Sequence, residues 1–142
     1  LQNEVRAAMP HPEQFVPDTL ENITAYLRED LCIGAYDGER LGAYFILRYC
    51  GRSAHNYAAF LGVPREEWEH WANADSAVVH PDWRGNGLQR KLLEAALPLV
   101  RPGIVGIGAT VSPDTSTTSR ASSPPSGAMR AMRPSRMQMS AA

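Results

Sequence analysis

Hydrophobic and polar positions divide the start of the chain into two amphipathic segments. Residues 2–9 place Val5 and Met9 at helical spacing, and Pro10 ends this segment. A second helix is predicted after Asp18 or Thr19, either of which can cap its first turn. Its apolar stripe consists of Leu20, Ile23, Tyr26 and Leu27.

Residues 31–49 predict a β-hairpin. Residues 31–36 and 41–49 favour strands, and Asp37-Gly38 between them is a strong hairpin-turn signal. A period of two divides the return strand between two faces. One face holds Leu41, Ala43, Phe45, Leu47 and Tyr49, and the other holds Gly42, Tyr44, Ile46 and Arg48.

The second half of the chain alternates between strands and helices. Residues 50–62 predict a loop and residues 64–71 a short helix, followed by a buried strand at residues 77–79 that Pro81 ends. A helix from Leu88 and a strand at residues 104–111 come next. The apolar side of that helix is Leu88, Leu92, Ala95, Ala96 and Leu99. The pattern predicts one α/β (α+β) domain over residues 1–111.

Composition agrees with a globular domain, since 44% of the residues are hydrophobic and 20% charged. The net charge of −1 gives no reason to expect nucleic acid or an anionic membrane as a partner. No apolar run approaches the roughly 20 residues that span a bilayer, and residues 1–6 do not resemble a signal peptide. Cys32 and Cys50 are predicted to be free thiols, which favours a cytoplasmic location, and two cysteines do not make a metal site.

Residues 112–142 differ in composition from the rest of the chain. They contain no Leu, Ile, Val, Phe, Tyr or Trp, but eight serines, three threonines and four prolines. Such a segment cannot bury enough apolar area to offset the entropy lost on ordering. We therefore predict a disordered or poorly packed tail.

The strand at residues 77–79, the glycines Gly85 and Gly87, and the helix from Leu88 form a layout that binds phosphate. Unpaired amides at a helix start point at an anion, and the helix dipole favours its charge. The glycines let the backbone approach closely, and Arg84 adds a fixed positive charge. The alternative is an ordinary strand-to-helix turn with a solvated arginine.

Residues 78–88, Val-Val-His-Pro-Asp-Trp-Arg-Gly-Asn-Gly-Leu, resemble the acetyl-CoA-binding motif of the GNAT acetyltransferases. The family pattern is Arg/Gln-x-x-Gly-x-Gly/Ala after a strand ending Val-x-Pro, and Gln89 replaces its last small residue. The resemblance extends over about residues 28–114. It implies a mostly antiparallel sheet flanked by helices, with the hairpin as the second and third strands and residues 104–111 splaying away from the motif strand.

The resemblance also implies an activity and its cofactor site. The family transfers an acetyl group from acetyl-CoA to an amine by direct attack. The pyrophosphate would lie on the amides of the glycine loop, and the pantetheine arm would pair in the wedge between the splayed strands. The implied cofactor-binding residues are Val78, Val79, Arg84, Gly85, Asn86, Gly87, Leu88, Gln89 and Arg90.

Catalytic roles follow from the same resemblance. An ammonium must lose a proton before it attacks, and Asp75, entering the motif strand, is the candidate base. A solvated strand-edge carboxylate is the alternative. His80 is a second candidate, and an amide near Val79 would polarise the thioester carbonyl. The wall of the acceptor site, if not simply core or surface, would come from Phe15, Arg48, His55, Tyr57, Trp68 and Trp71.

The chain departs from the family pattern at both ends. The strand expected before the first helix is absent, so we expect that the chain begins inside that helix. The asparagine and the tyrosine general acid expected after Asp114 are also absent, and we hypothesise a shift of reading frame there.

Two other functions remain open: a non-catalytic acyl-CoA-binding remnant, and a protein-interaction module that uses the aromatic insertion at residues 55–71. The sequence does not identify the amine, which can be a small molecule or a peptide, and it leaves a homodimer open.

Overall fold

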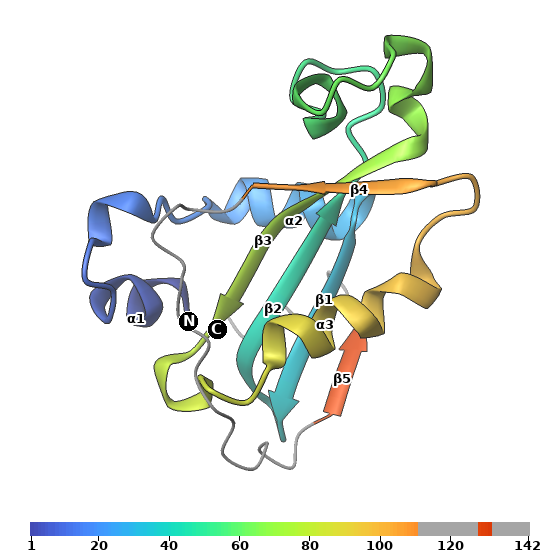
Figure 1. Cartoon of the computed structure of the whole chain (residues 1–142). Helices are drawn as coiled ribbons and strands as arrows, with labels where there is room; N and C mark the ends of the chain where they lie inside the picture. Colours follow the sequence, from blue (N-terminus) through green and yellow to red (C-terminus); the bar gives the residue numbers. More distant parts are fainter. Residues whose placement is uncertain (111–127, 132–142) are drawn as a thin grey trace.

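The computed structural model describes residues 1–110 and 128–131. Its helices are α1 (Gln2–Ala7), α2 (Leu20–Glu29) and α3 (Leu88–Ala96), and its strands are β1 (Leu31–Asp37), β2 (Arg40–Arg48), β3 (Trp71–Val79), β4 (Gly106–Ala109) and β5 (Ala128–Ala131) (Figure 1). Short 3-10 helices occupy Pro12–Gln14, Tyr57–Phe60, Arg65–His70, Pro81–Trp83 and Leu97–Leu99.

The described strands form one sheet in the order β4-β3-β2-β1-β5. The pairs β1–β2, β1–β5 and β2–β3 are antiparallel, and β3–β4 is parallel. This confirms the predicted mixed class with a mostly antiparallel sheet and flanking helices.

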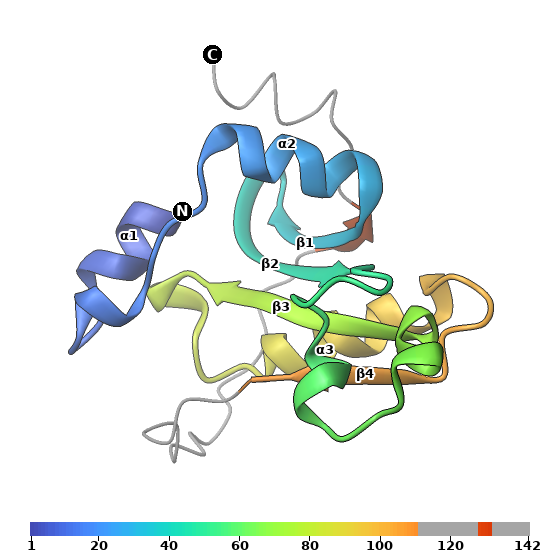
Figure 2. The ribbon, with the colours of Figure 1, turned by 90° about the horizontal axis from the view of Figure 1, so that it is seen from above.

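Helices cover both faces of the sheet (Figure 2). On one face α3 packs against β1 and β2 through Leu88, Leu92 and Ala96, which are buried. On the other face, helices α1 and α2 pack against the sheet through a second group of buried residues. This group, which we call the α1–α2 cluster, consists of Val5, Ile23, Leu27, Cys32, Tyr44, Ile46 and Val78. Thr19 caps α2, because its side chain accepts a hydrogen bond from the Asn22 amide at 3.1 Å.

Gly42 is an extra residue in β2, and it changes which face its neighbour occupies. Ala35 pairs with Ala43, but Tyr36 pairs with Leu41, so Gly42 has no partner in β1. A bulge of this kind shifts the side-chain alternation by one. Leu41 therefore packs with the α1–α2 cluster, and its predicted place on the face of Ala43 was wrong.

Three further expectations were wrong in detail. Leu20 and Leu99 were expected to face the core, but they are 64% and 54% exposed. Trp71 was expected to end a helix, but it begins β3, which is longer than the predicted residues 77–79. The apolar run at residues 77–79 is only the last part of this strand.

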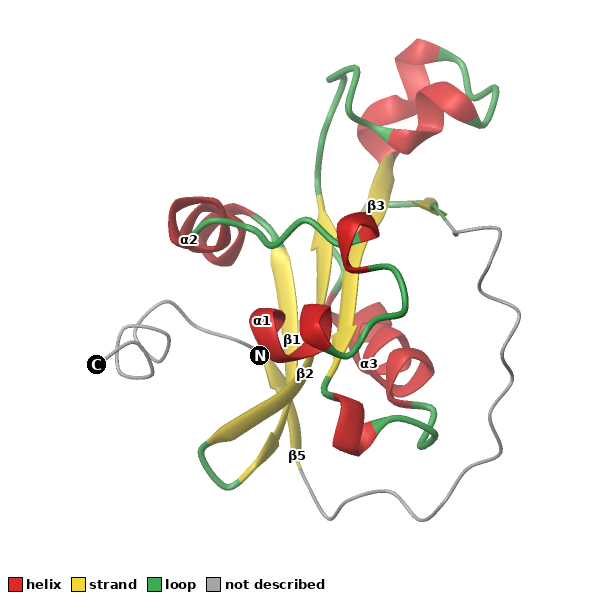
Figure 3. Cartoon of the chain, turned by 90° about the vertical axis from the view of Figure 1, so that its left-hand side faces the viewer, coloured by secondary structure: helices red, strands yellow, loops and turns green. Residues whose placement is uncertain are grey.

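Two buried asparagines hold the insertion between β2 and β3, which extends beyond the end of the sheet (Figure 3). Asn73 accepts a hydrogen bond from the Tyr57 amide and donates one to His55 O, both at 2.9 Å. Asn56 donates to Gly51 O and Trp68 O, both at 2.8 Å. The insertion is thus fixed through its own backbone.

Of the predicted tail, residues 128–131 form β5, which was not expected and lies beside β1. The other residues of 112–142 lie outside the described residues. The predicted disorder and the frame-shift hypothesis therefore stay predictions. None of the described helices is long and apolar enough to cross a membrane.

Candidate functional site

The glycine loop between β3 and α3 presents unpaired amides. Gly85 and Gly87 have φ angles of 79° and 65°, the left-handed region that favours glycine. Gly87 is the N-cap of α3, no side chain caps the helix, and no acidic residue occupies its first turn. The first amides of α3, from Leu88 to Arg90, have no partner within the helix, so they can bind an anion.

Trp83 and Asn86 give this loop its shape. The Trp83 indole packs on Gly42, and Asn86 Nδ2 donates to Trp83 O at 3.0 Å. Asn86 is 7% exposed, and its Oδ1 atom has no hydrogen-bond partner in the part of the chain that the structure describes. A buried acceptor without a donor is rare in folded proteins.

The charged side chains near the loop differ in how they are engaged. Arg84 is exposed at the start of the loop. Arg90 Nε donates to Glu94 Oε1 at 2.8 Å, along the outer side of α3, and Gln89 is exposed. Arg84 is therefore better placed than Arg90 to supply positive charge to an anion on the loop.

The second half of β3 has an open edge. β4 pairs with Trp71 to Ala74 only, and no described strand continues beyond that point (Figure 1). Ala77 is exposed although β3 is a central strand. The parallel pairing therefore ends before Asp75, and the edge of β3 from Asp75 to the glycine loop, which we call the wedge, has no described strand beside it.

The register of β3 decides which peptide groups face this wedge. The His80 amide donates to Gly42 O in β2 at 2.7 Å. Because backbone groups alternate along a strand, Val78 also faces β2, whereas Val79 and Ala77 face the open edge. We expected both Val78 and Val79 to pair with a ligand, and this is corrected. Val79 and Ala77 present their peptide groups at the open edge, whereas Val78 does not.

Asp75 lies where β3 and β4 separate. Ile46 pairs with Ser76 and Leu47 with Ala74, so Asp75 is the extra residue of a bulge in β3. Its Oδ1 lies 3.8 Å from Arg48 Nη1, and its Oδ2 accepts a hydrogen bond from Ser76 Oγ at 3.1 Å. A carboxylate held at the end of the wedge can accept a proton from a group bound there.

Nothing in the sequence placed Tyr26 and Asp18 near Asp75. The Arg48 guanidinium stacks on Tyr26 at 4.8 Å, and the Tyr26 hydroxyl lies 3.4 Å from Asp18 Oδ1. Burial, and after it the charge of Asp75, raises the pKa of Asp18. The sequence suggested only a helix cap at residue 18, because the pairing of β2 with β3 is what brings these residues together.

His80 is engaged at the other end of β3. It is buried, its Nδ1 accepts a hydrogen bond from the Asp82 amide at 3.1 Å, and its Nε2 lies 3.6 Å from Glu4 Oε1 of α1. His80 therefore shapes the turn after β3, and four residues of the strand separate it from Asp75.

The aromatic residues of the insertion mostly serve packing. The Trp71 ring lies against Gly106, and Tyr57 lies against Gly108, so both hold β4 in place. Trp68 Nε1 donates to Val63 O at 2.8 Å, while His55 is exposed. Phe15 packs against the α1–α2 cluster, as its core alternative predicted.

The two cysteines are free, and burial raises the pKa of Cys32 to about 12. Among the described residues, no group of three or more His, Cys, Asp or Glu side chains could hold a metal ion.

Comparisons of the chain with protein-family models, with curated proteins and with solved structures give no match. The fold and the geometry of the site therefore carry the functional argument.

Proposed function

We propose that this protein is a GNAT-type N-acetyltransferase, which transfers an acetyl group from acetyl-CoA to an amine by direct attack. The observation that carries the proposal is the continuity of two binding features. The open edge of β3 beyond Ala74 leads directly into the glycine loop and the start of α3. Together they suit a molecule with an amide-containing arm and a pyrophosphate at its end.

The order of the strands supports the same proposal. The elements follow one another in the order that the resemblance implies. They are an antiparallel hairpin (β1 and β2), a motif strand (β3), a covering helix (α3) and a diverging parallel strand (β4). β5 pairs antiparallel with β1 on the side away from β2.

The residues at the wedge would support the deprotonation of the amine and its attack on the thioester. The pantetheine amides would pair with the peptide groups of Val79 and Ala77, which places the thioester toward Asp75. Asp75 would accept a proton from the bound ammonium, directly or through water, so that the neutral nitrogen attacks the carbonyl. A strand amide at the open edge would donate a hydrogen bond to the developing oxyanion. The departing thiolate takes up a proton, for which the described residues suggest no donor.

Calorimetric titration with acetyl-CoA tests the proposal. We expect saturable binding that Arg84→Glu weakens at least about tenfold, or ~1.4 kcal/mol. Arg65→Glu is the matched control, because Arg65 is also exposed but lies on the insertion, at the opposite end of β3. Titration with ADP separates the loop from the wedge, since ADP has a pyrophosphate and no pantetheine arm. A well-folded protein that binds neither acetyl-CoA nor coenzyme A would refute the proposal.

One observation favours a second candidate, a protein-interaction module. Phe60 and Leu61 of the insertion are 81% and 54% exposed, although large apolar side chains usually find cover. Failure to bind any CoA ester, together with loss of a partner on Phe60→Ser, would favour this function. Binding of acetyl-CoA without turnover on a panel of amines would instead indicate a non-catalytic acyl-CoA-binding remnant.

A further inference from the structure

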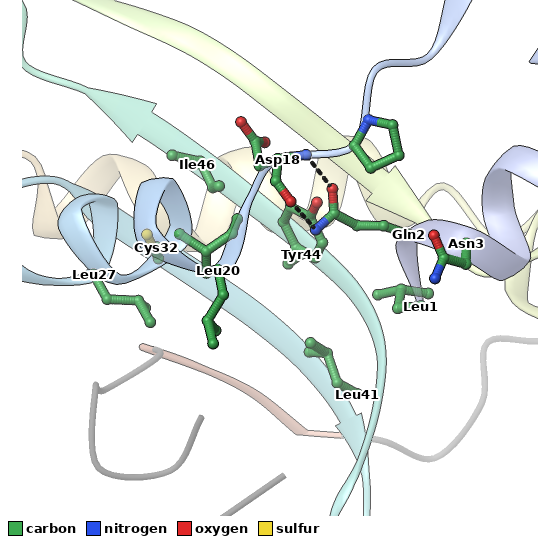
Figure 4. A pocket seen from close by; sticks show the side chains of 12 residues that line it. Leu1, Gln2, Asn3, Asp18, Leu20, Leu27, Cys32, Leu41, Tyr44 and Ile46 are labelled. Carbon is green, nitrogen blue, oxygen red and sulfur yellow. Dashed lines mark hydrogen bonds between the residues drawn. The ribbon is translucent and has the colours of Figure 1, made fainter. Parts of the chain in front are cut away.

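A cavity of about 530 Å³ lies between α1, α2 and the sheet, on the face opposite α3 (Figure 4). This volume falls in the range of small-molecule sites. Its walls are mainly apolar, with Leu20 and Leu27 from α2, and Leu41 and Ile46 from β2. Leu20, which the helix pattern placed in the core, lies instead at this cavity and is 64% exposed.

One end of the cavity is polar. Asp18, Gln2 and Tyr44 meet there, while Leu41 lies toward the other end (Figure 4). The Asp18 amide donates to Gln2 Oε1 at 2.7 Å, and this contact fixes the backbone from which the carboxylate projects. Among the described residues that line the cavity there is no Lys, Arg or His side chain, and the α-amino group of Leu1, which also lines it, is paired with Glu4 Oε2 at 3.3 Å.

Tyr44 provides an independent sign of a missing partner. Its side chain is 5% exposed, and its hydroxyl has no hydrogen-bond partner among the residues that the structure describes. The hydroxyl points to the end of the cavity formed by Asp18 and Gln2 (Figure 4). A buried hydroxyl is normally paired, so a polar group of a ligand reaching this end would complete its hydrogen bonding.

The charges at this end favour a cation. Next to the cavity, although not among its lining residues, the Arg48 guanidinium lies 3.8 Å from both Asp30 Oδ2 and Asp75 Oδ1. Tyr26 connects this group to Asp18 through the stacking on Arg48 and the 3.4 Å contact of its hydroxyl. Asp18 is the only one of these carboxylates among the described residues that line the cavity, and no guanidinium among them is in direct contact with it, so this end would favour an ammonium over an anion.

We propose that this cavity holds the acetyl acceptor, and that the acceptor is a primary amine with an apolar body, such as an alkyl- or arylalkylammonium ion. The inference rests on the proposed function. The apolar body would lie against Leu20, Leu27 and Leu41, and the ammonium would lie at Asp18. Asp75 projects to the same face of the sheet through its contact with Arg48, so an amine at Asp18 lies on the side from which Asp75 can take its proton.

Binding of 2-phenylethylammonium to the full chain, followed by NMR or calorimetry, tests this assignment. We expect saturable binding that Asp18→Asn weakens about tenfold, while the uncharged analogue 2-phenylethanol binds at least about tenfold more weakly than the amine. Asp37→Asn is the matched control, because Asp37 is an exposed carboxylate at the hairpin turn. Equal binding of the alcohol and the amine, or no effect of Asp18→Asn, would overturn the inference, since the cavity would then be apolar only.

Two further variants locate the ligand. Leu20→Trp would fill the cavity from an exposed position and should abolish amine binding without unfolding the protein. Tyr44→Phe removes the unpartnered hydroxyl, and we expect it to weaken amine binding while leaving the melting temperature equal or higher. If both variants bind the amine as the unaltered protein does, the ligand lies elsewhere and the assignment is wrong.

Titration of the same samples with acetyl-CoA separates the two proposals. Amine binding that depends on Asp18, without acetyl-CoA binding, would support the cavity and refute the acetyltransferase. Acetyl-CoA binding, without binding of 2-phenylethylammonium or of longer alkylammonium ions up to octyl, would support the cofactor site and refute the cavity as an acceptor site.

Discussion

The ring of Trp83 occupies the space that a side chain at Gly42 would need. A Cβ atom on Gly42 would lie 2.3 Å from Trp83 Cε3, closer than such atoms approach. Gly42 is also the bulge of β2, and its carbonyl accepts the hydrogen bond from the His80 amide. One glycine thus joins the second strand to the turn that leads into the glycine loop.

Gly42→Ala should destabilise the protein by about 1–3 kcal/mol, because the added methyl group forces Trp83 to move. Chemical denaturation measures this change. In a Trp83→Leu background the same substitution should cost less, since the smaller side chain leaves room. Equal penalties in the two backgrounds would show that the contact between Gly42 and Trp83 does not set the cost.

The amides of β3 should exchange with solvent in an alternating pattern. His80 bonds to Gly42 O, whereas Val79 faces the open edge, so the Val79 amide should exchange faster than the His80 amide. Acetyl-CoA should slow the exchange of Val79 and Ala77, while Phe45 within β2 serves as a control. Slow exchange of Val79 in the free protein would mean that another part of the chain covers this edge.

Asp75→Asn should lower kcat by about 10²–10⁴-fold and leave the affinity for acetyl-CoA unchanged, because general-base catalysis contributes on that order. The loss should be larger at low pH, where the amine cannot lose its proton unaided. Asp37→Asn is the control. A pH–rate profile that Asp75→Asn does not change would exclude Asp75 as the base.

Asp18→Asn should raise stability near neutral pH and have little effect in acid. Burial raises the pKa of Asp18 above its usual value of 3.8, so the folded state favours the protonated carboxyl. Stability from this group is therefore full below the unfolded pKa and is lost as the pH rises through the folded pKa. Thermal melts of both proteins between about pH 3 and pH 7 measure the difference. A variant that is less stable at neutral pH would contradict this sign.

Asn73→Ala should loosen the insertion, because it leaves the Tyr57 amide and the His55 carbonyl without their buried partner. The expected loss is about 1–3 kcal/mol for each group. Asn3→Ala, at an exposed position, is the control. Proteolysis should cut the insertion of the Asn73→Ala variant before the rest of the domain. An unchanged cutting pattern would show that other contacts hold the insertion.

Much of the secondary structure could be predicted from the sequence. The strands of the hairpin, the helices α2 and α3, and the left-handed glycines of the loop all follow from signals within a few residues. The glycine loop was predictable for the same reason, since Gly85, Gly87 and the start of α3 are adjacent along the chain.

The proposed acceptor site was not predictable in this way. Asp18 and Asp75 are 57 positions apart, and only the pairing of β2 with β3 and the packing of α2 bring them to one cluster. A strand pattern also cannot show where a neighbouring strand stops pairing, as β4 does at Ala74.

The sequence by itself determined the class of fold, the hairpin and the glycine turn between strand and helix, because periodicity and glycine conformations act locally. The tertiary structure decided the face of Leu41, the open edge of β3, and the cavity beside Asp18. These depend on one bulge at Gly42, one at Asp75, and the length over which two strands pair. Such features arise from contacts between distant segments, whose energies no local pattern of residues records.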